Sequence, residues 1–351
     1  MRVPWVQRLG ISFLAAVMAV PVGASASKPH QIQYVVISFD GAREIEQWHR
    51  SRNLAREAGA NFTYFLSCVY LLTGEDRGRY DPPGHKAGRS NVGFASSRDD
   101  VAQRLRQIWA ARLEGHEIAS HGCGHFDGGG WSQNQWRAEF DQFTHSVREA
   151  WSANDIPFQP AGWEHFADTE IEGFRAPYLS VGTSLAPALA DHGFVYDASG
   201  VSRDPEAPSH HDGVAMFSLP LIPEGSNGRR VLAMDYNLYV RHSAALERPS
   251  QSAQFEERAY TAFRAAFENQ YEGGRIPLQF GFHFRLMNAG AYWRALERFA
   301  KETCRMPDVR CVTYRELRAP SRSARERAFR LRRTRPTRPT DHHSAGPDSP
   351  A

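Results

Sequence analysis

The sequence predicts an α/β fold with a mainly parallel sheet that closes, or nearly closes, into a distorted (β/α)7-8 barrel. From about residue 33 to 317, short apolar runs alternate with amphipathic segments, and no internal repeat or interior linker divides this region. Strands that alternate with helices are typical of parallel sheets. Seven or eight strand–helix units in about 285 residues suit a single barrel.

The individual elements follow from hydrophobic periodicity. The run YVVISF (34–39) predicts a buried strand, because it is short, rich in β-branched residues and followed by Asp-Gly. The polar, Gly- and Pro-rich stretch 73–97 is longer than an ordinary connection and predicts a functional loop or a local insertion. By the same criteria helices are expected over 44–58, 98–114, 132–152, 183–192, 254–270 and 290–302, strands over 61–72, 116–121, 194–199, 276–284 and 309–314, and a further apolar segment over 231–240.

Composition and charge exclude two classes of protein. Of the 351 residues, 41% are hydrophobic and 12% aromatic, which is enough for a sizeable core and excludes a wholly disordered chain. The formal net charge is +3, but eight arginines against three acidic residues fall in 319–351, so the preceding part is slightly acidic. A nucleic-acid binder would be expected to carry a basic face, so none is predicted.

The N-terminus predicts a secretory signal peptide over 1–26. Arg2 and Arg8 form a basic region, 10–20 is apolar, and Ala24-Ser25-Ala26 supplies the small-x-small pattern for cleavage near Ala26. An uncleaved anchor is the alternative. Since no other run is long and apolar enough for a stable membrane span, the mature chain is expected to be secreted or periplasmic.

The C-terminal segment 319–351 is expected to be a disordered tail. It is rich in Arg, Pro and Ser and cannot bury enough apolar surface to fold. A solvated tail is the simpler interpretation, and an electrostatic contact with anionic envelope polymers or lipid headgroups is the alternative. The expected organisation is therefore a signal peptide (1–26), one enzyme-like domain (27–318) and this tail.

Export bears on the four cysteines, because disulfides persist in oxidising compartments. Cys304 and Cys311 are close enough to form a disulfide across a short loop. Cys68 and Cys123 both lie next to predicted strand ends, but the sequence does not decide whether they pair. A thiolate metal ligand at Cys123, beside two histidines, is the alternative.

Chemically active residue types follow several of the predicted strands, at the edge where a barrel places its active site. Asp40 directly follows the first strand, although an ordinary Asp-Gly turn would also explain it. His121 ends the strand HEIASH and His125 comes four residues later, a spacing that lets both imidazoles reach one metal ion.

Two further motifs complete the set. Arg175 in GFRAPY can hold a carboxylate through a paired hydrogen bond, and Pro177 restricts the backbone beside it. His283 lies in the apolar strand FGFHF, where a histidine is more often part of the core than a catalyst.

Together and in this order, SFDGA, HGCGH, RAPY and FGFHF resemble the motifs of the polysaccharide deacetylase family, the NodB-homology or carbohydrate esterase 4 proteins. The resemblance covers roughly residues 33 to 317. The segments 192–199 and 233–239 are similar to the stretch that supplies the family's fourth motif. The resemblance implies a barrel of the NodB-homology type and a metal-dependent hydrolase that removes N-acetyl groups from an envelope or extracellular amino-sugar polymer or oligomer.

The resemblance also implies roles for individual residues. His121 and His125 would hold a divalent metal, most naturally zinc, which acidifies a bound water and polarises the acetyl carbonyl. Asp40 would be the general base, and Arg175 would orient its carboxylate.

On the other side of the scissile bond, His283 would protonate the departing amine, with Asp235 as its partner. The backbone N–H of Tyr178 would stabilise the oxyanion.

One position departs from the family pattern. The second aspartate of the first motif, which is the third metal ligand, is replaced by Gly41. The site would then be completed by water, by a substrate group, or by another oxygen such as that of Asp127 or Asp40. Two alternatives to the deacetylase therefore stand: a carbohydrate-binding protein with impaired or no catalysis, and an amidohydrolase acting on a non-sugar C–N bond.

Overall fold

The computed structural model describes Met1 and residues 31–318. The expected signal peptide (1–26) and tail (319–351) lie outside the described residues, so both remain predictions. No helix within the described part has the length and apolar character needed to cross a membrane.

The sheet is built around strand β1 (Gln33–Gly41), which pairs in parallel with β9 (Leu278–His283), β2 (Thr63–Leu66) and β10 (Val309–Val312). The middle of β1 is buried on both faces, as expected for the central strand of a parallel sheet. Phe39 in β1 is fully buried and stacks on Tyr64 and Trp293.

The sheet continues from β2 in parallel and then closes on itself. In order, β2 is followed by β3 (Glu117–Ser120), β4 (Gly173–Phe174), β5 (Tyr196–Ser202) and β7 (Val214–Glu224), with β6 (Ser209–His211) and β8 (Arg229–Leu232) antiparallel to β7. Ala233 links the two ends: its N–H donates to Pro220 O and its carbonyl accepts from Gly281 N–H, both at 2.9 Å. The predicted α/β barrel is therefore confirmed.

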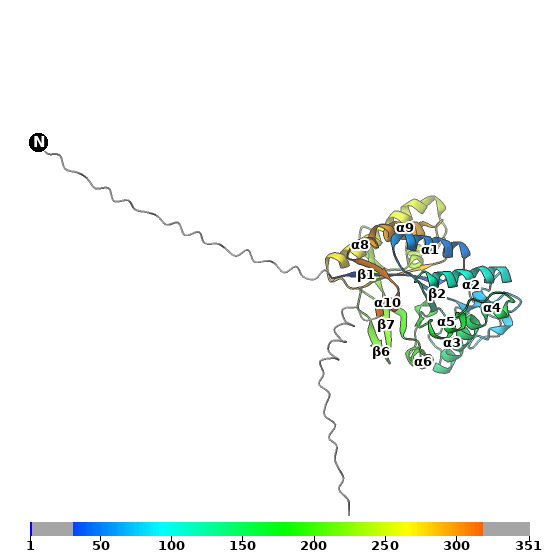
Figure 1. Cartoon of the computed structure of the whole chain (residues 1–351). Coiled ribbons are helices and arrows are strands. Elements are labelled where there is room, and N and C mark those ends of the chain that lie inside the picture. The colour runs from blue at the N-terminus through cyan, green and yellow to red at the C-terminus, as the bar shows by residue number, and fades with distance from the viewer. Residues whose placement is uncertain (2–30, 319–351) are drawn as a thin grey trace, which may run out of the picture. The chain divides into compact units, whose positions relative to one another are not determined.

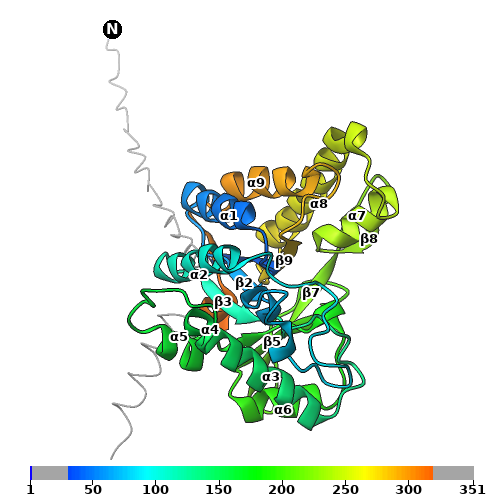
Figure 2. The same cartoon turned by 90° about the vertical axis from the view of Figure 1, so that its right-hand side faces the viewer.

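Helices surround this sheet, and Figures 1 and 2 show α9, α1 and α2 next to one another along its outside. Their bounds are α1 Ile45–Ala58, α2 Arg98–Leu113, α3 Gln133–Arg148, α4 Ala150–Ala153, α5 Trp163–Thr169, α6 Leu185–His192, α7 Asp235–Ser243, α8 Ser252–Glu272, α9 Ala291–Thr303 and α10 Tyr314–Arg318, with 3-10 turns η1 Cys68–Leu71, η2 Arg77–Arg79, η3 Pro177–Leu179 and η4 Pro249–Gln251. Ser132 and Gln135 form a reciprocal capping box that fixes the start of α3.

Three expectations differ from the structure. The strand expected over 61–72 ends at Leu66, because the chain turns into η1, where Cys68 N–H donates to Gly122 O and Cys68 is disulfide-bonded. The apolar segment 231–240 is divided between the end of β8 and helix α7. Strand β7 was not predicted, since Pro220 and Pro223 interrupt a run that otherwise suits a strand.

Candidate active site

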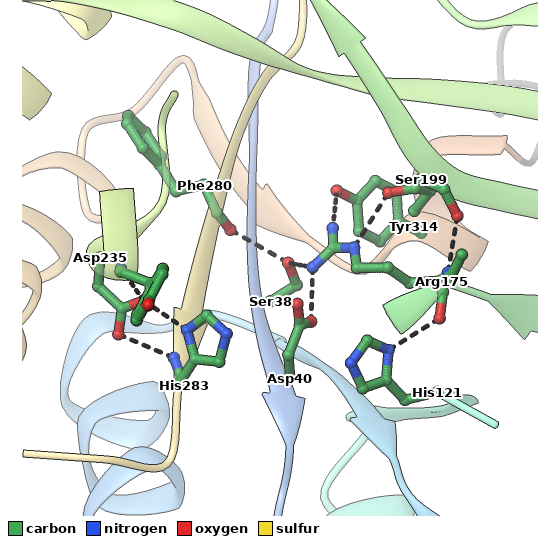
Figure 3. Close-up of polar contacts among 12 residues, drawn as sticks. Ser38, Asp40, His121, Arg175, Ser199, Asp235, Phe280, His283 and Tyr314 are labelled. Atoms are coloured by element: carbon green, nitrogen blue, oxygen red, sulfur yellow. Dashed lines mark hydrogen bonds and ion pairs between the residues drawn. The ribbon is translucent and has the colours of Figure 1, made fainter. Parts of the chain in front are cut away.

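The motif residues converge at the carboxyl ends of the parallel strands. Asp40 lies near the end of β1, His121 directly after β3, Arg175 directly after β4 and His283 at the end of β9. Asp40, His121, His125 and His283 line one cavity of about 280 Å³. Figure 3 shows Asp40 between His283 on one side and His121 on the other.

Arg175 is the fully buried centre of this arrangement. Its Nη1 donates to Asp40 Oδ1 at 2.7 Å and to Ser38 Oγ at 2.9 Å, its Nη2 donates to Tyr314 Oη at 2.8 Å, and its Nε donates to Ala198 O at 3.0 Å (Figure 3). Each guanidinium nitrogen therefore has a partner, which a buried cation requires.

The same contacts decide the charge of Asp40. Burial alone would raise the pKa of its carboxyl, but the positive charge of Arg175, aided by that of His283, holds this pKa below its usual value. Asp40 is therefore a carboxylate at neutral pH. Its Oδ1 is bound by Arg175, and the residue faces the cavity.

His121 and His125 are placed as neutral imidazoles. His121 Nδ1 lies 2.8 Å from the carbonyl oxygen of Arg175, and since a carbonyl only accepts, Nδ1 carries the proton and Nε2 keeps a free lone pair. Burial lowers the pKa of His121 to about 3 and also lowers that of His125. The two ring centroids are 5.1 Å apart.

These two side chains suit a metal ion in part. Nδ1 of His125 is buried and has no hydrogen-bond partner among the described residues, so this ring has an uncommitted nitrogen. Within residues 31–318, no group of three or more His, Cys, Asp or Glu side chains is arranged to hold a metal. The donor set therefore fits a divalent ion held by two imidazoles, with its other positions open to water or substrate.

The two other oxygens expected to compensate for Gly41 differ in position. Asp127 is exposed, accepts from Gly129 N–H at 2.9 Å and does not line the cavity. Asp40 lines the cavity, but its Oδ1 is engaged by Arg175.

A buried polar cradle holds the loop between the two histidines. Glu139 accepts from Cys123 N–H at 2.6 Å and from the hydroxyl of Tyr80, which in turn accepts from Gly124 N–H at 3.0 Å. The loop has no room for larger side chains, because a Cβ on Gly124 would lie 2.6 Å from the Tyr80 ring. Sequence reasoning missed Glu139 and Tyr80. The sequence offered a signal for Glu139 alone, because this glutamate lies on the otherwise apolar face of the helix over 136–143.

The cysteines form two disulfides. Cys304–Cys311 confirms the expected short-loop bridge. Cys68–Cys123 settles the pairing that the sequence left open and joins η1 to the histidine loop. Cys123 therefore offers no thiolate, and the alternative of a cysteine metal ligand was wrong.

His283 is paired with Asp235, on the side of Asp40 away from His121. The Asp235 carboxylate accepts from His283 backbone N–H at 2.8 Å and lies 2.7 Å from ring Nδ1 (Figure 3). Burial lowers the pKa of His283, but the charge and hydrogen bond of Asp235 outweigh this and raise it. With Nδ1 engaged, Nε2 is the nitrogen left to exchange a proton.

The segment after β4 is shaped by a positive φ of 58° at Tyr178 and a buried polar chain behind it. Ala176 N–H donates to Ser199 Oγ at 2.7 Å, and Ser199 N–H and Oγ–H both donate to Asp197 Oδ1. The Tyr178 ring is exposed and lies edge-on to His125 with ring centroids 4.6 Å apart.

Two supporting residues near Arg175 were not predicted. Ser38 precedes Asp40 by two residues, so the alternation of a strand puts both on one face, and this signal was available in the sequence. Tyr314 comes from the start of α10, far along the chain, and only the closed sheet brings it to Arg175.

Comparison with known proteins supports the fold. No protein-family model and no curated protein sequence matches the chain. Among solved structures, a "putative polysaccharide deacetylase" from Mycobacterium smegmatis is 17% identical with a TM-score of 0.53, and the alignment covers 90% of this chain and 97% of that one.

Two more distant structures are a "probable polysaccharide deacetylase" from Pseudomonas aeruginosa PAO1 and PuuE allantoinase. Both are 14% identical over 86% of this chain and 96% of theirs, with TM-scores of 0.48 and 0.46. The likeness to the Mycobacterium smegmatis protein shows that the described chain shares the fold of that protein, in agreement with the fold that the sequence motifs suggested.

The buried Asp197 generates a pH prediction. Burial raises the pKa of this carboxyl from its ordinary value of 3.8 to about 6. The folded state therefore holds a proton that the unfolded state releases, and stability is lost as pH rises from about 4 to about 6. Asp197→Asn removes this titration, so urea unfolding should show the variant gaining about 2 kcal/mol relative to wild type between pH 4 and pH 7. A stability difference that is the same at both pH values would contradict this assignment.

Proposed function

We propose that this chain is an exported, metal-dependent N-deacetylase that acts on an amino-sugar polymer or oligomer of the cell envelope or its surroundings. The observation that carries the proposal is that one cavity brings together an ionised Asp40, a proton-holding His283 and two neutral imidazoles, with Asp40 between His283 and His121. A base and an acid that line one cavity suit the two proton transfers of amide hydrolysis.

His121 and His125 are proposed to hold the metal, and zinc suits two imidazole ligands. When bound there, the ion would lower the pKa of water and polarise the acyl carbonyl. His121 is already oriented for this task, because its Nδ1–H bond to Arg175 O directs Nε2 away from the backbone.

The chain's own residues perform the proton transfers. Asp40 takes the proton of the attacking water, while Arg175 keeps its carboxylate ionised and fixed. The C–N bond then breaks, the acetyl carbon leaves as acetate, and His283 gives its Nε2 proton to the departing amine. Asp235 fixes the tautomer and orientation of His283 throughout. The backbone N–H of Tyr178 is proposed as an oxyanion donor.

The fold and one exposed aromatic ring favour a carbohydrate substrate. The structure with the highest TM-score of those described above is called a polysaccharide deacetylase. In this chain, the exposed Tyr178 ring beside His125 offers a flat apolar face on which a sugar ring could stack. Placement in the envelope or outside the cell rests on the N-terminal signal pattern alone.

A second candidate is a carbohydrate-binding protein without turnover, and Gly41 is the observation that favours it. With no third protein ligand among residues 31–318, the metal would be held more weakly than by a three-ligand site. The binder would show sugar affinity with neither metal nor acetate release.

Metal content tests the ligand assignment. Wild type dialysed against zinc and then buffer should retain close to one equivalent, and His121→Ala should lose most of it together with acetate release from N-acetylated chito-oligosaccharides. His210→Ala, at an exposed position in β6, is the matched control and should behave as wild type. Equal zinc in wild type and His121→Ala would show that the metal is bound elsewhere. Retained zinc in wild type without acetate from any sugar would shift the assignment to a non-sugar amide.

The pH profile of turnover tests the acid. Because Asp235 raises the pKa of His283 against the effect of burial, Asp235→Asn should lower it. The protonated form is the donor, so the alkaline limb of kcat should move to lower pH. An alkaline limb that stays in place while kcat merely falls would rule out His283 as the group that titrates there.

A further inference from the structure

Tyr70 is a cavity residue to which neither the motifs nor the mechanism above give a task. It lies in η1 and lines the same cavity as Asp40, His121, His125 and His283. The residue is only 5% exposed. No residue of the described range 31–318 forms a hydrogen bond with its hydroxyl, so a buried residue that lines the cavity has a polar group without a partner there.

The hydroxyl of Tyr70 also lies close to Gly41, the position that departs from the family pattern. A Cβ built on Gly41 would lie 3.8 Å from Tyr70 Oη and 3.9 Å from Cε2 of the ring. A side chain at position 41 would therefore project against this phenol. Where the resemblance leads one to expect a carboxylate, the cavity wall of this chain presents a hydroxyl.

A disulfide and a buried arginine fix the backbone that carries Tyr70. Cys68, two residues earlier, is disulfide-bonded to Cys123 of the histidine loop. The buried Arg104 donates to Tyr70 O at 2.7 Å through Nη1 and to Arg43 O at 2.9 and 2.7 Å through Nε and Nη2. One guanidinium thus ties the turn that carries Tyr70 to the segment that follows Gly41, so the hydroxyl needs little reorganisation to act.

The phenol is a donor at all ordinary pH values. Burial raises the pKa of Tyr70 to about 12, and Glu44 acts in the same direction against Arg43 and Arg104. A neutral phenol has one O–H to donate, whereas a metal ligand would have to be the phenolate.

We infer that the Tyr70 hydroxyl is a substrate-binding group that donates a hydrogen bond to the acyl oxygen, from the place where a side chain at position 41 would lie. This inference rests on the proposed function for the identity of the acyl group. The acyl oxygen gains negative charge as water adds to the carbonyl, so a fixed donor stabilises the transition state more than the ground state.

The test uses Tyr70→Phe, which removes only the oxygen, with Tyr260→Phe on the outer helix α8 as the matched control. Three quantities are measured on the full chain: the Kd of acetate by NMR titration, bound zinc, and kcat/KM on an N-acetylated chito-oligosaccharide. Tyr70→Phe should unfold at the same temperature as wild type, because the hydroxyl has no partner in the described residues.

Tyr70→Phe should weaken acetate binding about tenfold and lower kcat/KM by about 10²-fold, with zinc content unchanged. Tyr260→Phe should change none of the three. An acetate Kd equal to that of wild type would overturn the inference, and so would a loss of zinc, which would make the phenol a metal ligand.

The outcome separates this inference from the proposed function. If wild type releases no acetate from any sugar but Tyr70→Phe still weakens acetate binding, the function fails and the role of the hydroxyl stands. If both proteins release acetate with equal kcat/KM and bind acetate equally, the function stands and the role of Tyr70 fails.

Discussion

The buried ion pair between Arg175 and Asp40 is the constraint on which the site depends. A guanidinium with no exposed surface is tolerated only because each of its nitrogens is hydrogen-bonded, and its partners come from β1, β5 and the start of α10. Removing one member of such a pair typically costs about 3–5 kcal/mol, because the remaining charge is left buried and unpaired. The parallel strands thus meet at this cation, and the first and third motifs are held together by it.

The same interaction sets the protonation states around the cavity. Arg175 lowers the pKa of Asp40 against the effect of burial, and its carbonyl fixes the tautomer of His121. His121 stays neutral because burial disfavours its charge. The pKa of His283, in contrast, is raised by the neighbouring Asp235. One cavity therefore offers a carboxylate, two neutral imidazoles and a proton donor at the same pH. The replacement of a carboxylate by Gly41 removes one negative charge from this set and leaves room that Tyr70 borders.

The sequence was sufficient for the barrel and for the residues that follow its strands, because Asp40, His121, Arg175 and His283 lie in or beside short apolar runs that predict strands. It was insufficient where the partner lies far along the chain. Tyr314 reaches Arg175 only because β10 pairs with β1, and the Cys68–Cys123 pairing depends on how η1 meets the histidine loop. Strand β7 was not predicted because Pro220 and Pro223 interrupt the apolar run from which a strand would be recognised. Tyr70 was missed because its turn carries the apolar pattern of a strand.

The most direct test of this account is a double-mutant cycle on the stability of the full chain, with Arg175→Met, Asp40→Asn and the two combined, by urea unfolding at pH 7. Arg175→Met should be the most destabilised protein, and adding Asp40→Asn should recover stability, with a coupling energy of about 2–4 kcal/mol. Additive effects of the two substitutions would contradict the claim that Arg175 keeps Asp40 ionised within the site.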